Sequence, residues 1–332
     1  MPPERWAALD AVKTTALLGT LLGHILIWWY GENQGAGAVV YRLDAHQTAA
    51  TVAMGFMFAL VSASGAIFHL HLKRLAGLPA LAGRIAVLLA AGLLLGLNLH
   101  PFVILWNVFG FYASSLLLIA MIQRAFGWKG MALFSAASYL LTPLLRRGLD
   151  GSSYWTAVLI GDAQGLLSFF PLFPWFSLLG LGWLAGELFE RDPQAFRRKA
   201  ATTGTLLILA GLPFLSPLDF SNVFGITSRI PLAYPLFFGG IFLAALALCD
   251  ALFGKKAFSA YHPLNAVGRH PLAVYLVTLL TMLALTSKWT GRGSASGFWT
   301  LNALTLAVAY AAGAALETAR LRKNASLKAG TG

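Results

Sequence analysis

Residues 11–31 read AVKTTALLGTLLGHILIWWYG, an apolar run whose only basic or imidazole side chains are Lys13 and His24. A helix of about 20 apolar residues is long enough to cross the hydrocarbon core of a bilayer. The run follows charged residues and lacks a small-residue cleavage site, so we expect it to be retained as a helix instead of being removed as a signal peptide. It predicts the first membrane span of the chain.

Similar apolar runs recur along all 332 residues. Apolar residues make up 58% of the chain and charged residues 11%, whereas a soluble domain carries roughly 25% charge. The sequence therefore predicts an all-α polytopic membrane protein, a bundle of about ten transmembrane helices. The expected spans are 11–31, 48–68, 84–99, 102–123, 129–145, 167–189, 201–216, 230–252, 270–287 and 297–318. The more polar stretch 146–166 predicts a loop or a short interfacial helix.

The basic residues predict the orientation of this bundle. With the N-terminus in the cytoplasm and alternating sides, 18 of the 24 Lys and Arg residues fall on the cytoplasmic side and 6 on the other. This bias follows the positive-inside rule, so we expect both termini in the cytoplasm. We expect one transmembrane domain over 1–318 and a disordered basic tail over 319–332 that is attracted to anionic lipid. A bacterial inner membrane is the expected location.

Composition also argues against several classes of function. The net charge of +12 is spread over short loops between apolar runs, which disfavours a nucleic-acid partner. Cys249 is the only cysteine, so an internal disulfide is excluded. There is no phosphate-binding glycine loop, no serine nucleophile elbow and no histidine pair at zinc spacing, and we expect no metal. His69 and His71 flank a predicted cytoplasmic loop, where we expect them to be solvated.

Ionisable side chains inside a span are costly and mark candidate sites. Lys13 and His24 are eleven residues apart, which places them on one helix face about 16 Å apart along the axis. A cation at the cytoplasmic mouth and an imidazole deeper on the same face suit a long anionic cofactor, with the imidazole as general base. The alternative is that Lys13 snorkels to headgroups and His24 makes a helix–helix hydrogen bond.

Other polar residues form a second group of candidates, each with a structural alternative. Asp44 and His46 stand in the first outer loop, where an imidazole near carboxylates could activate a hydroxyl or amine acceptor; the alternative is a solvated loop. Asp10 is expected to pair with Lys13 or cap the helix. The remaining candidates lie within or beside later spans: Asn107, Asp162, Trp175, Arg269 and His270.

The opening of the chain resembles that of the transmembrane acyltransferase superfamily. Arg5, Leu9-Asp10, Lys13 and His24 are similar to its pattern of Leu-Asp and then Arg/Lys, ten residues and His. The superfamily includes the acyltransferase-3 proteins and the heparan-α-glucosaminide N-acetyltransferase group. Further segments resemble motifs of that group: MFALVSASG (57–65), LWNVFGFY (105–112), GDAQGLLSFFPLFPWFSLLGLGWLAG (161–186) and GRHPLAVYLVTLL (268–280). Two positions depart from the pattern, since the usual Arg is Lys13 and Thr278 stands where many relatives have histidine.

The resemblance implies a membrane-bound O- or N-acyltransferase of about ten or eleven helices. Acetyl-CoA or another acyl-CoA would bind from the cytoplasm, and a hydroxyl or amine of an extracytoplasmic glycan or amino sugar would accept the acyl group. The expected catalytic residues are His24, His46 and Asp44. The expected donor-binding residues are Lys13, Arg5, Asn107 and Arg269. The expected acceptor-binding residues are Asp162, Trp175, Asp10 and His270.

Two other functions stay open at this stage. A transporter or flippase of an amphipathic or lipid-linked solute would be expected to show inverted repeats and broken helices, and the sequence shows no repeat. A non-catalytic membrane scaffold is the other alternative. Besides lipids, acyl-CoA and the acceptor, a homodimer partner is compatible with the sequence. The acceptor and the acyl chain are not specified by it.

Overall fold

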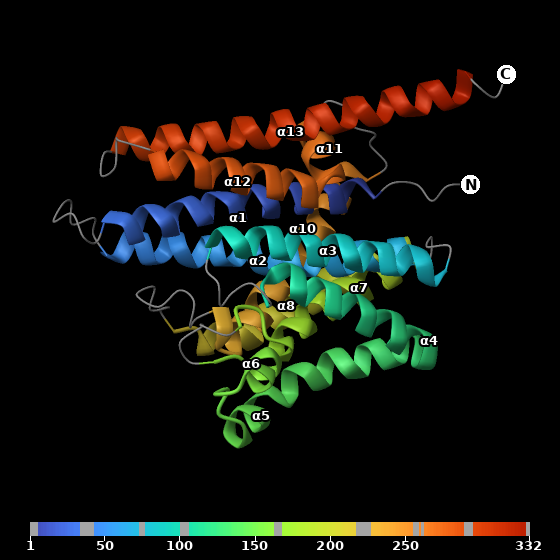
Figure 1. Cartoon of the computed structure of the whole chain (residues 1–332). Helices are drawn as coiled ribbons and strands as arrows, with labels where there is room; N and C mark the ends of the chain where they lie inside the picture. The colour runs from blue at the N-terminus through green and yellow to red at the C-terminus, as the bar shows by residue number, and fades with distance from the viewer. Residues whose placement is uncertain are drawn as a thin grey trace. The chain divides into compact units, whose positions relative to one another are not determined.

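The computed structural model describes residues 6–33, 43–72, 77–99, 106–162, 168–216, 227–254, 259, 262–288 and 295–329 (Figure 1). Within these ranges the chain forms twelve α-helices and one short 3₁₀ helix, and no strand. The α-helices are α1 Ala7–Asn33, α2 Leu43–Leu72, α3 Leu78–Leu99, α4 Val108–Leu140, α5 Thr142–Gly148, α6 Tyr154–Ile160, α7 Leu172–Arg191, α8 Pro193–Gly211, α10 Ala233–Phe253, α11 Pro263–Arg269, α12 Pro271–Lys288 and α13 Ala295–Ala329. The 3₁₀ helix η1 covers Leu212–Phe214. The predicted all-helical architecture is confirmed.

Six described helices are long and apolar enough to cross a membrane: Ala7–Leu26, Met54–Leu72, Val108–Leu140, Leu172–Arg191, Ala233–Phe253 and Ser296–Ser326. α11 and α12 form a seventh span if they are taken together, although they are bent by 90° at their junction. α3 contains a shorter apolar helix, Leu78–Leu94. The chain is therefore a helical integral membrane protein, while ten spans and two cytoplasmic ends stay predictions.

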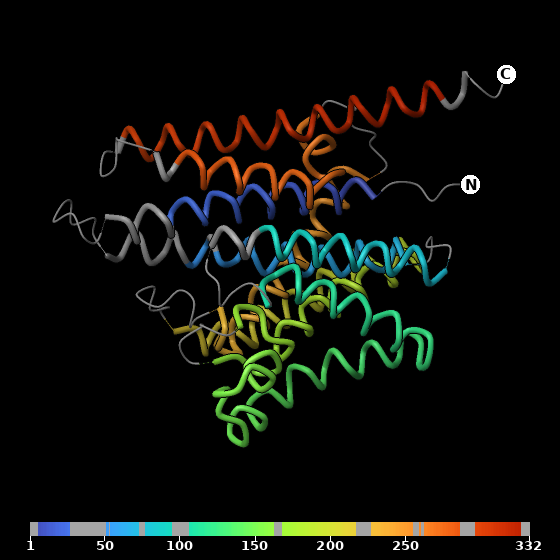
Figure 2. Tube along the Cα trace, viewed as in Figure 1, coloured from blue at the N-terminus to red at the C-terminus, as the bar shows by residue number. Residues whose placement is uncertain are grey.

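α4 is divided by a sharp turn at Gly127. This residue has φ 61° and ψ −154°, a left-handed conformation that a glycine adopts without the steric penalty of a Cβ. The chain changes direction there, so the residues before and after Gly127 form two separate helical segments (Figure 2). The sequence predicted two spans here, 102–123 and 129–145. The stretch 146–166, predicted as a loop or short interfacial helix, contains the short helix α6, whereas α5 begins at Thr142 inside the predicted span 129–145.

The described chain divides into two compact units. The first unit joins Met1–Leu60 to Cys249–Gly332, and the second is Val61–Leu248. In the first unit α1 packs against α11, α12 and α13. Leu17, Leu21 and Ile25 recur every four residues on α1 and are fully buried, and they share a cluster with Val267 and Val274. This cluster fixes the helix that carries Lys13 and His24.

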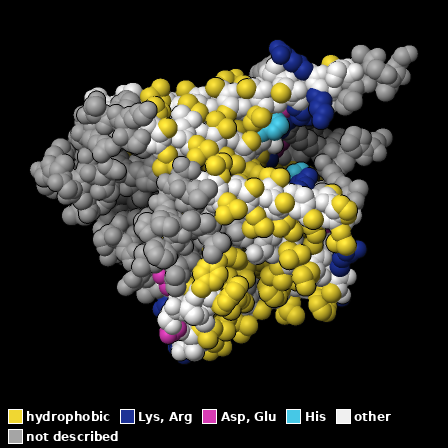
Figure 3. Space-filling view, viewed as in Figure 1, with side chains coloured by type: hydrophobic (Ala, Val, Ile, Leu, Met, Phe, Trp, Pro, Cys, Tyr) yellow, Lys and Arg dark blue, Asp and Glu magenta, His cyan; other side chains and the backbone are white. Residues whose placement is uncertain are grey.

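The surface that this chain presents is largely apolar. Hydrophobic side chains cover much of the described face that Figure 3 shows, and Asp and Glu are sparse on it. Phe126, Leu133, Trp155 and Phe214 are each more than 70% exposed. Phe126 and Leu133 lie on the long apolar helix α4, where exposed side chains of this kind are typical of contact with lipid tails. α13 continues as a helix to Ala329, through most of the stretch that was expected to be a disordered tail.

In the second unit α2 and α7 approach each other at glycines. A Cβ atom added to Gly182 would overlap the carbonyl oxygen of Ser62, and one added to Gly65 would overlap the carbonyl oxygen of Leu179. Small residues at such positions let helix backbones pack closely within a membrane. This contact brings the end of α2 against α7.

We expect Gly182→Ala to destabilise the protein by roughly 2 kcal/mol, because the added methyl group meets a backbone atom that cannot rotate away. The midpoint of thermal unfolding in detergent measures the effect. Gly83→Ala is the matched control, since a Cβ at Gly83 has no atom within 4 Å. Equal unfolding midpoints for the two variants would contradict the close approach of α2 and α7.

Candidate active site

His24 lies on α1 in the first unit and is held by two polar contacts. Its Nδ1 lies 2.8 Å from the carbonyl oxygen of Thr20, and its Nε2 lies 3.4 Å from the hydroxyl of Tyr275 on α12. The two rings meet edge to face with centroids 6.0 Å apart. A carbonyl oxygen can only accept a hydrogen bond, so Nδ1 carries the proton and Nε2 of a neutral ring is the basic nitrogen. This arrangement is suited to a general base.

Lys13 and Asp10 form a buried ion pair one turn into α1. Lys13 Nζ donates to Asp10 Oδ1 at 2.9 Å, and both residues are less than 10% exposed. The expected pairing of these two residues is confirmed. Trp6 Nε1 donates to Asp250 at 3.2 Å in the same unit. Because Asp10 already neutralises Lys13, a phosphate that bound Lys13 would compete with this carboxylate.

The junction of α11 and α12 carries a second charged cluster. Arg269, His270 and Arg320 surround the carboxylate of Glu317, which is fully buried on α13. His270 Nε2 lies 3.4 Å and Arg320 NH2 2.7 Å from Glu317, and Arg269 NH1 is ion-paired with it.

Gly268 connects this junction with the start of α1. A Cβ on Gly268 would lie 2.6 Å from the Thr14 hydroxyl and 2.9 Å from the Asp10 carbonyl oxygen. Arg269 and His270 thus lie near the turn of α1 that holds Asp10 and Lys13. The sequence predicted a span that begins at 270. In the structure the short helix α11 comes directly before α12, and the two helices are bent by 90° at their junction.

Asn107 belongs to the second unit, where it caps α4. Its Oδ1 accepts from the backbone N–H groups of Phe109 and Gly110, and its Nδ2 donates to the carbonyl oxygen of Gly92 at 2.8 Å. An asparagine at the N-cap satisfies donors that a helix start leaves open. The structure gives Asn107 this capping role, and its predicted role toward a donor stays a prediction.

Asp162 and Trp175 are both buried and bind the segment around residue 228 in the second unit. Ser228 Oγ donates to Asp162 Oδ1 at 3.1 Å and accepts from the Asp162 N–H at 2.8 Å. Trp175 Nε1 donates to the Thr227 carbonyl oxygen at 2.9 Å. Asp162 and Trp175 therefore both contact the segment at residues 227–228, which is called the 227–228 connection below.

Arg146 lies beside the 227–228 connection and is held by two carbonyl oxygens. It donates to those of Ile160 and Ile230, at 3.2 and 2.9 Å. Burial, with a smaller contribution from Arg229, lowers the pKa of Arg146 to about 10. Arg146 therefore links the end of α6 at Ile160 to the segment that contains Ile230.

Several predicted site residues fall where the structure gives no side-chain contact. Arg5 lies outside the described residues. Asp44 and His46 are in the first turn of α2, but their side chains are outside the described part of the chain. Their predicted roles stay predictions.

The structure also shows polar residues that sequence reasoning missed. The prediction that His69 is solvated is wrong, because its ring is buried between Glu187 and Glu190 of α7. Glu317 was equally overlooked, although it falls at the end of a predicted span. Both cases carry the same usable signal, an ionisable side chain close to or inside an apolar run.

Comparison with known proteins identifies the family. No curated protein and no solved structure matches the chain significantly. A family model described as heparan-alpha-glucosaminide N-acetyltransferase, catalytic, matches residues 5–217, which is more than half of the chain. The match contains Lys13, His24, Asp162 and Trp175, and it ends before the cluster around Glu317. The resemblance seen in the first span is confirmed, and the chain belongs to the heparan-α-glucosaminide N-acetyltransferase-like family of membrane acyltransferases.

Proposed function

We propose that this protein transfers an acyl group, in the simplest case acetyl, from a cytoplasmic acyl-CoA to a hydroxyl or amine of an extracytoplasmic glycan or amino sugar. The family match supports acetyl transfer as the reaction class. The observation that carries the proposal is the position of His24, within a membrane helix and with Nδ1 on the Thr20 carbonyl oxygen. A neutral imidazole held in this tautomer presents Nε2 as a base.

The proposed reaction needs one proton acceptor and one electrophile. The acceptor hydroxyl or amine attacks the thioester carbonyl carbon while His24 Nε2 takes its proton, so that a C–O or C–N bond forms. The tetrahedral intermediate then expels the CoA thiolate as the C–S bond breaks, and the imidazolium returns the proton to sulfur. Tyr275, whose hydroxyl lies 3.4 Å from Nε2, orients the ring and is placed to donate a hydrogen bond to a developing negative charge.

The donor side of the site is proposed to lie at the start of α1. Lys13 and Arg269 bring positive charge to this region, and Gly268 lies against Asp10 and Thr14. Because Asp10 neutralises Lys13, a phosphate would have to share or displace that carboxylate. Arg269 and Arg320 together exceed the single negative charge of Glu317, so this cluster keeps a net positive charge that favours an anionic donor.

We expect Lys13→Gln to weaken acetyl-CoA binding about tenfold, the loss of one charge-assisted hydrogen bond to a phosphate. The dissociation constant measured by titration calorimetry in nanodiscs checks this. Lys13→Gln leaves the buried Asp10 without its cation, so the double variant Asp10→Asn/Lys13→Gln separates lost binding from lost folding. Wild-type affinity in both variants would remove Lys13 from the donor site.

The experiment that tests the proposed function uses the purified full chain in nanodiscs. Acetyl-CoA labelled in the acetyl group is supplied, and binding, release of free thiol and transfer to a panel of amino sugars and sugar alcohols are followed. Without an acceptor, we expect the protein to bind acetyl-CoA and hydrolyse its thioester slowly. With one of the sugars of the panel, we expect acetyl-CoA to be consumed faster. If the protein neither binds nor consumes any CoA ester, the proposed acyltransferase function is excluded.

A transporter remains a second candidate because one observation favours it. α11 and α12 are bent by 90° at a junction that carries charged side chains, and discontinuous helices of this kind form solute sites in transporters. Flux of a labelled amphipathic solute into proteoliposomes, with no CoA ester consumed, is the result that would favour this function.

A further inference from the structure

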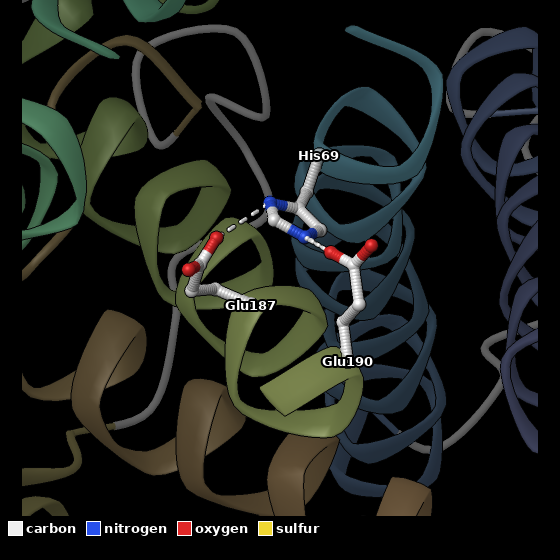
Figure 4. A group of neighbouring side chains, drawn as sticks. All are labelled: His69, Glu187 and Glu190. Atoms are coloured by element: carbon white, nitrogen blue, oxygen red, sulfur yellow. Dashed lines mark hydrogen bonds and ion pairs between the residues drawn. The ribbon is translucent and has the colours of Figure 1, made fainter. Parts of the chain in front are cut away.

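His69, Glu187 and Glu190 form a compact polar group inside the second unit, apart from the residues proposed for acyl transfer. His69 lies near the end of α2, and its side chain is fully buried. Its Nδ1 is 3.3 Å from Glu187 Oε2 and its Nε2 is 2.7 Å from Glu190 Oε2. Figure 4 shows the two glutamates of α7, each with its carboxylate at a different nitrogen of the imidazole.

The surroundings hold this group in place. The edge of the imidazole meets the Trp183 ring, with centroids 4.8 Å apart, and Gly186 leaves space for it. Arg191 Nε donates to Glu187 Oε1 at 2.5 Å, so the other oxygen of Glu187 is the one turned toward His69. Glu187 is buried, whereas the side chain of Glu190 is 41% exposed. The group is therefore rigid on one side and open to solvent on the other.

The chemistry of these side chains is that of a metal site. One nitrogen and two carboxylate oxygens, one from each residue, lie within 4.8 Å of one another. An imidazole nitrogen and carboxylate oxygens suit Zn²⁺ or Mn²⁺, whereas a ligand set of oxygens alone would favour Mg²⁺ or Ca²⁺.

We propose that His69, Glu187 and Glu190 bind a divalent transition-metal ion, Zn²⁺ or Mn²⁺, that links the end of α2 to α7. The ion enters on the side of Glu190, whose side chain is 41% exposed. Because the two carboxylates lie at different nitrogens of His69, binding requires them to rotate toward the one nitrogen that holds the ion, until their oxygens reach the roughly 2.0–2.2 Å bonds that such ions take. A proton on the ligating nitrogen leaves to solvent, and water fills the remaining coordination positions.

A metal-free interpretation makes a different prediction. If His69 is an imidazolium held between two carboxylates, the group is a salt link between helices and needs no ion. In that case added metal would change neither the unfolding midpoint nor the heat of titration. The two interpretations therefore differ in direct metal binding and do not depend on enzyme activity.

The test uses the full chain in detergent, purified without a polyhistidine tag, treated with a chelator and dialysed. It is titrated with ZnCl₂ and separately with MnCl₂, with MgCl₂ for comparison, and the bound metal is counted by mass spectrometry. We expect one Zn²⁺ or Mn²⁺ per chain and a higher unfolding midpoint with the ion present. Glu190→Gln should weaken this binding at least tenfold while the metal-free protein remains folded, because Glu190 is partly exposed.

Asp150→Asn is the matched control, since it removes an exposed carboxylate of the same unit that lies in a loop. We expect this variant to bind metal as the wild type does. Glu187→Gln tests the buried ligand, and metal-free unfolding of this variant shows its folding separately. A wild type that binds neither Zn²⁺ nor Mn²⁺, or a Glu190→Gln variant that binds as tightly as the wild type, would overturn the proposal.

Discussion

Replacing Glu317 with glutamine is expected to destabilise the protein by roughly 3 kcal/mol, because it removes the carboxylate that pairs with the Arg269 and Arg320 guanidiniums and contacts the His270 imidazole. Glu317 is fully buried, while Arg269 and Arg320 keep 20% and 42% of their side-chain surface. The glutamine amide cannot neutralise either guanidinium, and Arg269 would be left partly buried with an uncompensated charge. The midpoint of chemical or thermal unfolding in detergent measures the loss.

Two control variants replace the arginines of this cluster, which differ in how deeply they are buried. Arg320→Gln removes the more exposed cation and should cost no more than about 1 kcal/mol, as exposed ion pairs do. Arg269→Gln combined with Glu317→Gln should recover part of the stability that Glu317→Gln loses, since the unpaired charge is then absent. If Glu317→Gln unfolds at the wild-type midpoint, the cluster does not hold α11 and α13 together.

Apolar runs predicted most helices but not their breaks. The runs 230–252 and 167–189 agree with α10 and α7 within a few residues, because length and hydropathy suffice to define a span. α8 begins at Pro193, where Asp192 caps the helix, although the span was predicted to begin at 201. That stretch carries Arg197, Arg198 and Lys199, and a search for apolar runs passes over a cap followed by charged residues.

The candidate site was predictable only where its contacts are local. The pair of Asp10 and Lys13 is three residues apart, and helix periodicity places both on one face. Tyr275, by contrast, is 251 residues from His24, and the carboxylates that bury His69 are more than a hundred residues away from it. Such contacts depend on how helices pack, which the pattern of one helix does not specify.

His24→Ala is expected to reduce acyl transfer by about 10²–10⁴-fold, the usual contribution of a positioned general base. Binding of acetyl-CoA should stay within about twofold of the wild type, because the imidazole is proposed to act on the nucleophile and not to hold the donor. Turnover with labelled acetyl-CoA and dissociation constants for the same preparation measure the two effects. A loss of turnover without a loss of binding would support His24 as the base.

Two further variants decide between His24 and the other candidates. Tyr275→Phe keeps the ring that packs on His24 and removes only the hydroxyl 3.4 Å from Nε2. We expect this variant to transfer acyl groups roughly tenfold more slowly than the wild type. His46→Ala tests the second histidine that the family resemblance implies. If His24→Ala turns over normally and His46→Ala does not, the base is His46 and the reaction class still holds. If both variants keep full activity, proton abstraction by a histidine of either helix is wrong, and His24 is a packing residue that links α1 to α12.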